Sequence, residues 1–126
     1  MNENNRLAGV NLVTGDPQRL AAFYRDMLGA RLVEDHGGPD RIEIWFGEPG
    51  EGNVYIAAHR EEGFRPRPYQ ACQGFELRVE HADALCQALK ARGVPIEEGP
   101  RDLPWGYRFF HIKDPDGNGI DLVQKL

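Results

Sequence analysis

His111 and Asp121 are a basic and an acidic side chain that could act together in the second half of the chain. They lie in two strand-like runs joined by Asp114-Pro-Asp-Gly-Asn118, whose proline, glycine and asparagine predict a tight hairpin turn. If the hairpin pairs Lys113 with Gly119, His111 lies opposite Asp121 and the two side chains can hydrogen-bond. A histidine held by a carboxylate can serve as a metal ligand or as a general base.

Glu76 and His59 are further polar groups that the alternation of strand residues turns to the same side as His111 and Asp121. Two interpretations stay open. In one, these side chains form a displaced metal or acid/base site. In the other, they line a wet pocket or satisfy one another across strands. Glu76 also lies two residues from Arg78, which is more typical of a local charge pair than of a catalytic couple.

The residues needed for a serine nucleophile or a phosphate-binding loop are absent from the sequence. The chain contains no serine and no glycine-rich phosphate loop, so a serine nucleophile is excluded. Cys72 and Cys86 have no metal-type spacing, and we expect both to be reduced thiols. Cys72 is the thiol that could reach the mouth of a groove, but no neighbour in the sequence would lower its pKa.

Aromatic side chains are the second group with a chemical use. The same alternation sends several of them inward, where they could stack on a flat ligand or pack between sheets. Trp105, in a Pro-Trp-Gly turn, is either a loop anchor or a ligand contact. Together with the polar groups, they give a predicted set of ligand-binding residues: Asn11, Trp45, Tyr55, Glu76, Tyr107, Phe109, His111 and Asp121.

The elements that position these residues begin with a strand and a helix. Residues 7–13 alternate as a strand does, and Thr14-Gly-Asp-Pro17 supplies a turn, an N-cap and an N1 proline. Apolar residues at helical spacing predict a helix over 17–28, ended by Gly29. Three β-type runs follow, at 31–35, 41–46 and 53–59. The first unit is therefore βαβββ.

The pattern then restarts, because the strand-like run that begins at Gly74 matches the one that begins at Gly9 at an offset of 65. The second copy predicts a helix over 82–92 and strands at 95–98, 107–113 and 119–124. We predict an α+β fold, in which two βαβββ modules form a curved eight-stranded sheet pair. The domain spans 1–126, with repeat 1 at about 7–60, a linker at about 61–72 and repeat 2 at about 73–126. Open sheet edges favour a homodimer.

Composition limits the partners. The chain has 126 residues and a net charge of −5, with no cluster of lysine and arginine, so nucleic acid is not an expected partner. The polar start Met1-Asn-Glu-Asn-Asn-Arg6 leads into no apolar run long enough for a signal or a membrane span. We therefore expect a cytoplasmic protein with no membrane partner.

Three motifs resemble those of the vicinal oxygen chelate superfamily, which includes glyoxalases, dioxygenases and bleomycin-resistance proteins. They are Phe23-Tyr-Arg-Asp-Met-Leu-Gly29, Pro104-Trp-Gly-Tyr-Arg-Phe-Phe110 and Asp114-Pro-Asp-Gly-Asn-Gly-Ile-Asp121. The last two are similar to those of bleomycin-resistance-type binding proteins. The resemblance implies a protein that sequesters an antibiotic-like or aromatic small molecule in a groove at a dimer interface.

The resemblance also implies where metal-dependent members place their ligands, in the first and last strand of each repeat. Those positions fall on Gly9, Gly74, Tyr55 or Ala57, and Asp121, so a single carboxylate is kept. One carboxylate cannot hold a divalent ion, and we expect no cofactor. The alternative is a metal-dependent lyase, isomerase or dioxygenase with a relocated divalent-metal site of Glu76, His111 and Asp121.

Overall fold

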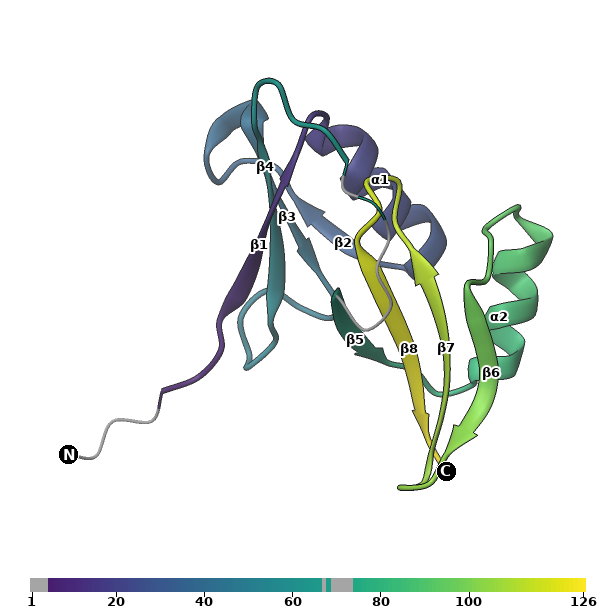
Figure 1. Cartoon of the computed structure of the whole chain (residues 1–126). Coiled ribbons are helices and arrows are strands. Elements are labelled where there is room, and N and C mark those ends of the chain that lie inside the picture. Colours follow the sequence, from purple (N-terminus) through teal and green to yellow (C-terminus); the bar gives the residue numbers. More distant parts are fainter. Residues whose placement is uncertain (1–4, 67, 69–73) are drawn as a thin grey trace. The chain divides into compact units, whose positions relative to one another are not determined.

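The chain divides into two compact units, Met1–Pro66 and Arg67–Leu126, each with one sheet and one main helix (Figure 1). The computed structural model describes residues 5–66, 68 and 74–126. The boundary between the units lies inside the predicted linker. Cys72 lies outside the described residues, so its thiol state stays a prediction.

The first unit is a βαβββ module with a four-stranded sheet in the order β1-β4-β3-β2. Its parallel pair is β1 with β4, and the other neighbours are antiparallel. Its elements are β1 (Gly9–Thr14), α1 (Pro17–Leu28), β2 (Arg31–Val33), the 3-10 helix η1 (Gly38–Asp40), β3 (Arg41–Trp45) and β4 (Tyr55–Arg60).

Helix α1 has the bounds that the sequence predicts, because both of its ends are marked by local chemistry. The Asp16 side chain accepts a hydrogen bond from the backbone N–H of Arg19, and Pro17 occupies the first turn. Gly29 ends the helix with φ of 75°, a left-handed conformation that favours glycine. The buried face of α1 packs on β3 and β4.

The second unit repeats this topology, with the sheet order β5-β8-β7-β6. Its parallel pair is β5 with β8. The buried face of α2 packs on β6, β7 and β8. The elements are β5 (Gly74–Arg78), α2 (Ala82–Ala91), β6 (Glu98–Leu103), β7 (Tyr107–Lys113) and β8 (Gly119–Lys125). Two four-stranded sheets with two helices confirm the predicted α+β class.

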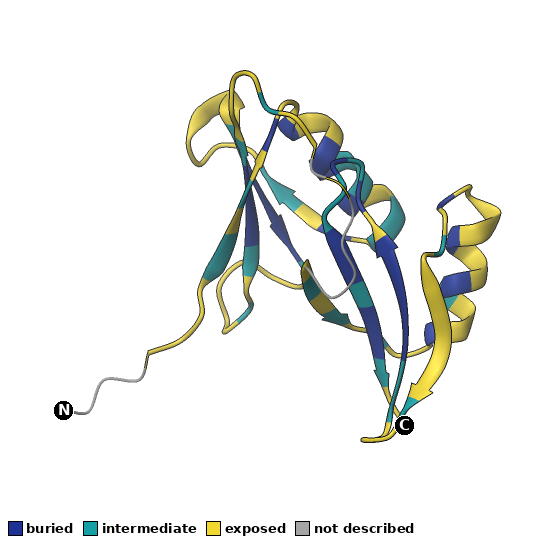
Figure 2. Cartoon of the chain, viewed as in Figure 1, coloured by how far each residue is buried: buried dark blue, intermediate teal, exposed yellow. Residues whose placement is uncertain are grey.

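Strand β6 is where the sequence prediction was wrong. A strand was expected at 95–98, whereas β6 runs from Glu98 to Leu103. Gly99 and Pro100 are poor strand formers and removed the signal. The structure accommodates them through a register shift between Glu98 and Arg101, where Gly99 adopts φ of 83°. β6 is also the most exposed strand of its sheet, as Figure 2 shows.

The turn between β7 and β8 sets the register of the hairpin that carries His111 and Asp121. The Asp114 carboxylate accepts hydrogen bonds from the backbone N–H groups of Asp116 (2.9 Å) and Asn118 (3.0 Å) and from the Asn118 amide (2.8 Å). These bonds close the turn. Lys113 pairs with Gly119, which is the condition under which the sequence placed His111 opposite Asp121.

Alternation divides each sheet into a helix-covered face and an opposite face. In the second unit, Phe110, Ile112, Ile120 and Leu122 are fully buried on the side of α2. The intervening residues of β7 and β8 therefore point to the other face, which carries the candidate site. Among the described residues, none of the helices is long and apolar enough to cross a membrane.

Candidate functional site

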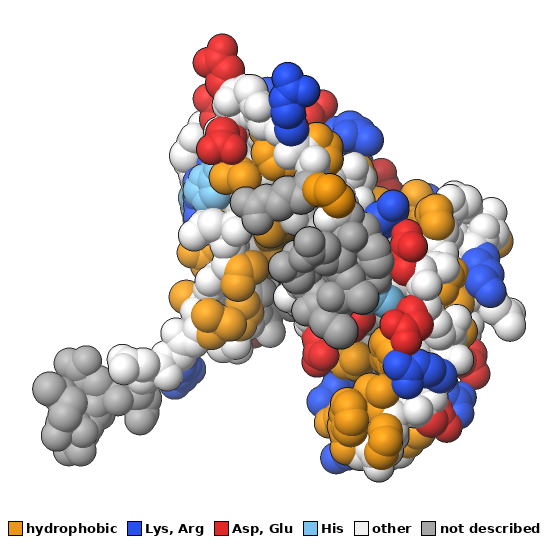
Figure 3. Space-filling view, viewed as in Figure 1, with side chains coloured by type: hydrophobic (Ala, Val, Ile, Leu, Met, Phe, Trp, Pro, Cys, Tyr) orange, Lys and Arg blue, Asp and Glu red, His pale blue; other side chains and the backbone are white. Residues whose placement is uncertain are grey.

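A pocket of about 240 Å³ lies in the second unit, and we call it the second-unit pocket. Side chains from all four strands of this sheet and from the β6–β7 turn line it. Figure 3 shows hydrophobic side chains beside acidic and basic ones in the second unit, at the lower right of the view. The lining residues are Glu76, Glu98, Arg101, Leu103, Trp105, Phe109, His111, Asp121 and Val123.

His111 and Asp121 are paired within this pocket, as the hairpin register predicts. They are directly opposite each other on β7 and β8, and His111 Nδ1 hydrogen-bonds to Asp121 Oδ1. The His111 side chain is buried, while Asp121 is partly exposed. The bond fixes the orientation of the imidazole and leaves the second carboxylate oxygen of Asp121 for other contacts.

Glu76 lies beside Asp121 because β5 and β8 pair in parallel with these two residues in register. Glu98, on β6, is the third carboxylate that lines the pocket. Arg101 supplies the one guanidinium among the lining residues that the structure describes. Three carboxylates to one guanidinium give the pocket a negative potential at neutral pH, which attracts cations.

Arg101 lies over the ring of Phe109, its cross-strand partner, with Cζ 4.8 Å from the ring centroid. Glu98 holds the guanidinium through Oε1, which accepts from Arg101 Nε (3.0 Å) and Nη2 (2.8 Å). Phe109 is only 8% exposed, although it lines the pocket. The predicted stacking face of Phe109 is therefore already covered by a cation.

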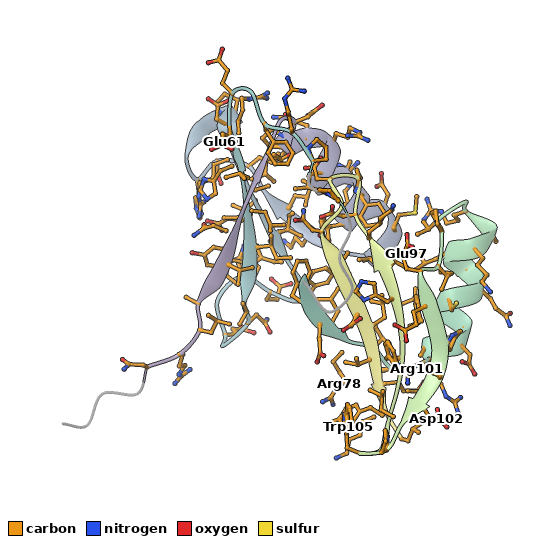
Figure 4. The ribbon with its side chains drawn as sticks, in the orientation of Figure 1. Glu61, Arg78, Glu97, Arg101, Asp102 and Trp105 are labelled. Atoms are coloured by element: carbon orange, nitrogen blue, oxygen red, sulfur yellow. The ribbon has the colours of Figure 1, made fainter. Side chains whose placement is uncertain are left out.

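Trp105 is a pocket residue that sequence reasoning left undecided. The β6–β7 turn holds it 67% exposed, so it is not a buried loop anchor. Figure 4 shows it at the same end of the second sheet as Arg101. Because the Pro-Trp-Gly turn presents a large aromatic group to solvent, Trp105 is free to contact a ligand at the pocket.

Four more lining residues were missed. Glu98, Arg101 and Leu103 belong to β6, whose predicted bounds were wrong, so their side chains could not be assigned to a face. Val123 could have been found, because it lies two residues after Asp121 on the same strand.

The residues predicted to bind a ligand divide between the two units. Asn11, Trp45 and Tyr55 lie in the first unit, whereas Glu76, Phe109, His111 and Asp121 line the second-unit pocket. Tyr107 is outside the lining. Its ring and hydroxyl are engaged by Arg78, whose Cζ is 5.1 Å from the ring centroid and whose Nη2 donates to the hydroxyl at 3.1 Å.

The first unit carries a charged and aromatic cluster on the sheet face away from α1. The Trp45 and Tyr55 rings are 4.8 Å apart between centroids at a 38° tilt. The buried Glu43 carboxylate accepts from Trp45 Nε1 (2.9 Å) and Arg41 Nη1 (2.6 Å) and lies 3.2 Å from His36 Nδ1. This network orients the Trp45 indole.

Glu43 is ionised through these contacts. Burial raises its pKa, but the hydrogen bonds from Arg41, Trp45 and His36 outweigh this effect, so the pKa lies below the ordinary value of 4.5. The role of Glu43 as an acceptor for three neighbouring side chains could be recognised only from the side-chain positions. In the same unit, His59 Nε2 hydrogen-bonds Asn11 Oδ1 at 2.8 Å. His59 thus belongs to the first unit, whereas Glu76, His111 and Asp121 belong to the second.

The positions that would bear metal ligands do not fit a metal. A Cβ on Gly74 would lie 1.9 Å from the carbonyl oxygen of Gly119, and φ of 135° disfavours any side chain. At Gly9, a Cβ would lie 2.7 Å from the Tyr55 ring. Across the described parts of the chain, no group of three or more histidine, cysteine, aspartate or glutamate side chains is placed to hold a metal ion.

Comparison with known proteins shows the family. A family model described as Glyoxalase/Bleomycin resistance protein/Dioxygenase superfamily matches residues 6–122. This span includes the first βαβββ unit and the second as far as Leu122 in β8, with every residue of the second-unit pocket except Val123. The chain belongs to this superfamily.

Individual relatives include a resistance protein, an enzyme and an antibiotic binding protein. A bleomycin resistance protein of Geobacillus stearothermophilus is 28% identical, over 91% of this chain and 93% of that protein. A lactoylglutathione lyase of Haemophilus influenzae is also 28% identical, over 90% and 87%. TnmS3, an antibiotic binding protein from Streptomyces sp. CB03234, has a TM-score of 0.72 and 27% identity, with 100% of both chains covered. Overall identity thus does not separate binding from catalysis.

Proposed function

We propose that this protein binds a small planar organic cation, such as part of an antibiotic, in the second-unit pocket and without a metal ion. The observation that carries the proposal is the composition of that pocket. Apolar and aromatic walls from Leu103, Trp105 and Phe109 stand beside the neighbouring carboxylates of Glu76 and Asp121. Such a site pairs stacking with charge attraction.

The size of the pocket limits what it holds. Pockets for drug-sized ligands measure roughly 300–1,000 Å³, and this one measures about 240 Å³. It fits one ring system with its cationic group, and the rest of a larger antibiotic would extend outside. Similarity to a bleomycin resistance protein and to the antibiotic binding protein TnmS3 supports this class of ligand.

Binding without metal is the second part of the proposal. It is supported by the glycines at the expected ligand positions, where Gly74 has no space for a Cβ. In the pocket, His111 and Asp121 act as a hydrogen-bonded pair that keeps the Asp121 carboxylate oriented. Among the residues that the structure describes, no group of histidine, cysteine, aspartate or glutamate side chains supports the metal-dependent alternative.

We also propose a homodimer located in the cytoplasm. Each four-stranded sheet has two edge strands, β1 and β2 in one unit and β5 and β6 in the other. Pairing with a second copy would cover such edges, which otherwise favour aggregation.

Tryptophan fluorescence tests the binding site, because the chain has two tryptophans in different units. Trp45 lies in the first unit, and Trp105 lines the pocket. In the Trp45→Phe variant, which retains Trp105, titration with bleomycin or 9-aminoacridine should quench the tryptophan fluorescence in a saturable way. Trp105→Phe should show little quenching. If quenching occurs only through Trp45, the second-unit pocket is not the binding site.

A further inference from the structure

Arg101 occupies the face of Phe109 that a planar ligand would need. Its guanidinium carbon is 4.8 Å from the Phe109 centroid, within the range of a cation–π contact. Both residues line the second-unit pocket and pair across β6 and β7. A protein side chain thus already makes the contact that the proposed cationic ligand would make.

The contacts that hold Arg101 are weak enough to exchange. The Arg101 and Glu98 side chains are 55% and 44% exposed. Ion pairs and cation–π contacts at such exposed positions contribute little free energy, because water screens the charges. Arg101 also sits on the exposed strand β6, where its long side chain has solvent space to move into.

We propose that Arg101 is a displaceable cover on Phe109, tethered by Glu98, that competes with the ligand for the ring face and so lowers affinity for planar molecules. This inference rests on the proposed function, since it needs a planar ligand in the second-unit pocket. It makes Arg101 a specificity-determining residue: a ligand must stack well enough on Phe109 to displace a guanidinium.

The charges of the two residues allow a clean variant. Arg101→Gln alone would uncover the ring and also make the pocket more negative, so a gain in cation affinity would have two causes. The double variant Arg101→Gln with Glu98→Gln removes one positive and one negative charge. The net charge of the pocket is then unchanged, and the ring face is free of its cation.

Calorimetric titration with 9-aminoacridine at pH 7.5 measures the effect. We expect the double variant to bind about fivefold more tightly than wild type, which corresponds to roughly 1 kcal/mol. Acridine, which is neutral at this pH, should show a similar gain because the ring face is freed for it too. Adding Phe109→Leu, which removes the ring, should abolish the gain. Circular dichroism with thermal unfolding confirms that each variant is folded.

Arg78→Gln is the matched control. Arg78 also stacks on an aromatic ring of this sheet, that of Tyr107, but neither residue lines the pocket. Its removal should leave the affinity for acridine unchanged, because acridine is neutral and does not respond to the lost charge.

The outcomes separate this inference from the proposed function. If wild type binds 9-aminoacridine and the double variant binds it equally or more weakly, Arg101 does not compete with the ligand. It then either has no effect on binding or contacts the ligand itself. A gain in affinity that persists when Phe109→Leu is added also contradicts the proposal that Arg101 covers the Phe109 ring. If neither wild type nor the double variant binds either acridine, the proposed function itself is wrong, and the inference about Arg101, which depends on it, is wrong as well.

Discussion

Replacing Glu43 by glutamine should destabilise the first unit by about 2–3 kcal/mol at pH 7. Both carboxylate oxygens accept hydrogen bonds, from Trp45 at one and from Arg41 at the other. A glutamine has one acceptor oxygen, so its NH₂ group must face a donor. Losing a charged hydrogen bond and leaving a buried donor unsatisfied each cost about 1–3 kcal/mol. Arg41 keeps a bond to the His36 carbonyl, which moderates the loss.

The effect should depend on pH with a defined sign. The folded-state pKa of Glu43 is lowered from 4.5, so the unfolded chain takes up a proton at higher pH than the folded chain does. The stabilisation is complete above about pH 4.5 and is lost as the pH falls through the lowered pKa. The free-energy difference between wild type and Glu43→Gln should therefore shrink in acid.

Urea unfolding, followed by Trp45 fluorescence in a Trp105→Phe background, measures this difference in the first unit. Glu48→Gln is the control, because Glu48 also pairs with an arginine, Arg31, but at an exposed position. It should cost less than about 1 kcal/mol. Equal costs for the two variants, or a Glu43→Gln difference that grows as the pH falls, would refute the buried-network argument.

Three shorter predictions address the hairpin, the glycine position and the assembly. Asp114→Ala should lower the free energy of unfolding by about 2–3 kcal/mol, measured in urea, because three turn hydrogen bonds are lost; an unchanged midpoint would contradict this role. Gly74→Ala should lower Tm strongly, while Gly38→Ala, with no atom within 4 Å, should cost only its backbone strain; equal losses would contradict the packing argument. Light scattering should give twice the 14.2 kDa chain mass, and a monomer at all concentrations would rule out the dimer.

Most of the fold could be predicted from periodicity and turn chemistry. The α1 helix has both caps written in its sequence, and its observed bounds match the prediction. The turn between β7 and β8 predicted the hairpin, and the contact between His111 and Asp121 followed from one register of it, the one that pairs Lys113 with Gly119. Local signals sufficed in both cases because neighbouring residues determine these structures.

The pocket could be predicted only in part, because its remaining wall depends on non-local packing. β6 contains Gly99 and Pro100, and the register shift that accommodates them appears only in its pairing with β7. The stack of Arg101 on Phe109 follows from that pairing and was not foreseen. Gly74 was interpreted as a vacated ligand position, whereas the structure gives a stronger reason for glycine: the backbone of Gly119 occupies the space.

Charge recognition by the second-unit pocket is the central claim, and calorimetry on Glu76→Gln tests it most directly. Glu76 is exposed and lies beside Asp121, so removing its charge should leave the fold intact. We predict roughly three- to tenfold weaker binding of 9-aminoacridine, with acridine binding unchanged, because only the cation gains from the carboxylate. Glu80→Gln, an exposed acid outside the pocket lining, should change neither affinity. Equal affinities of wild type and Glu76→Gln for the cation would contradict the claim.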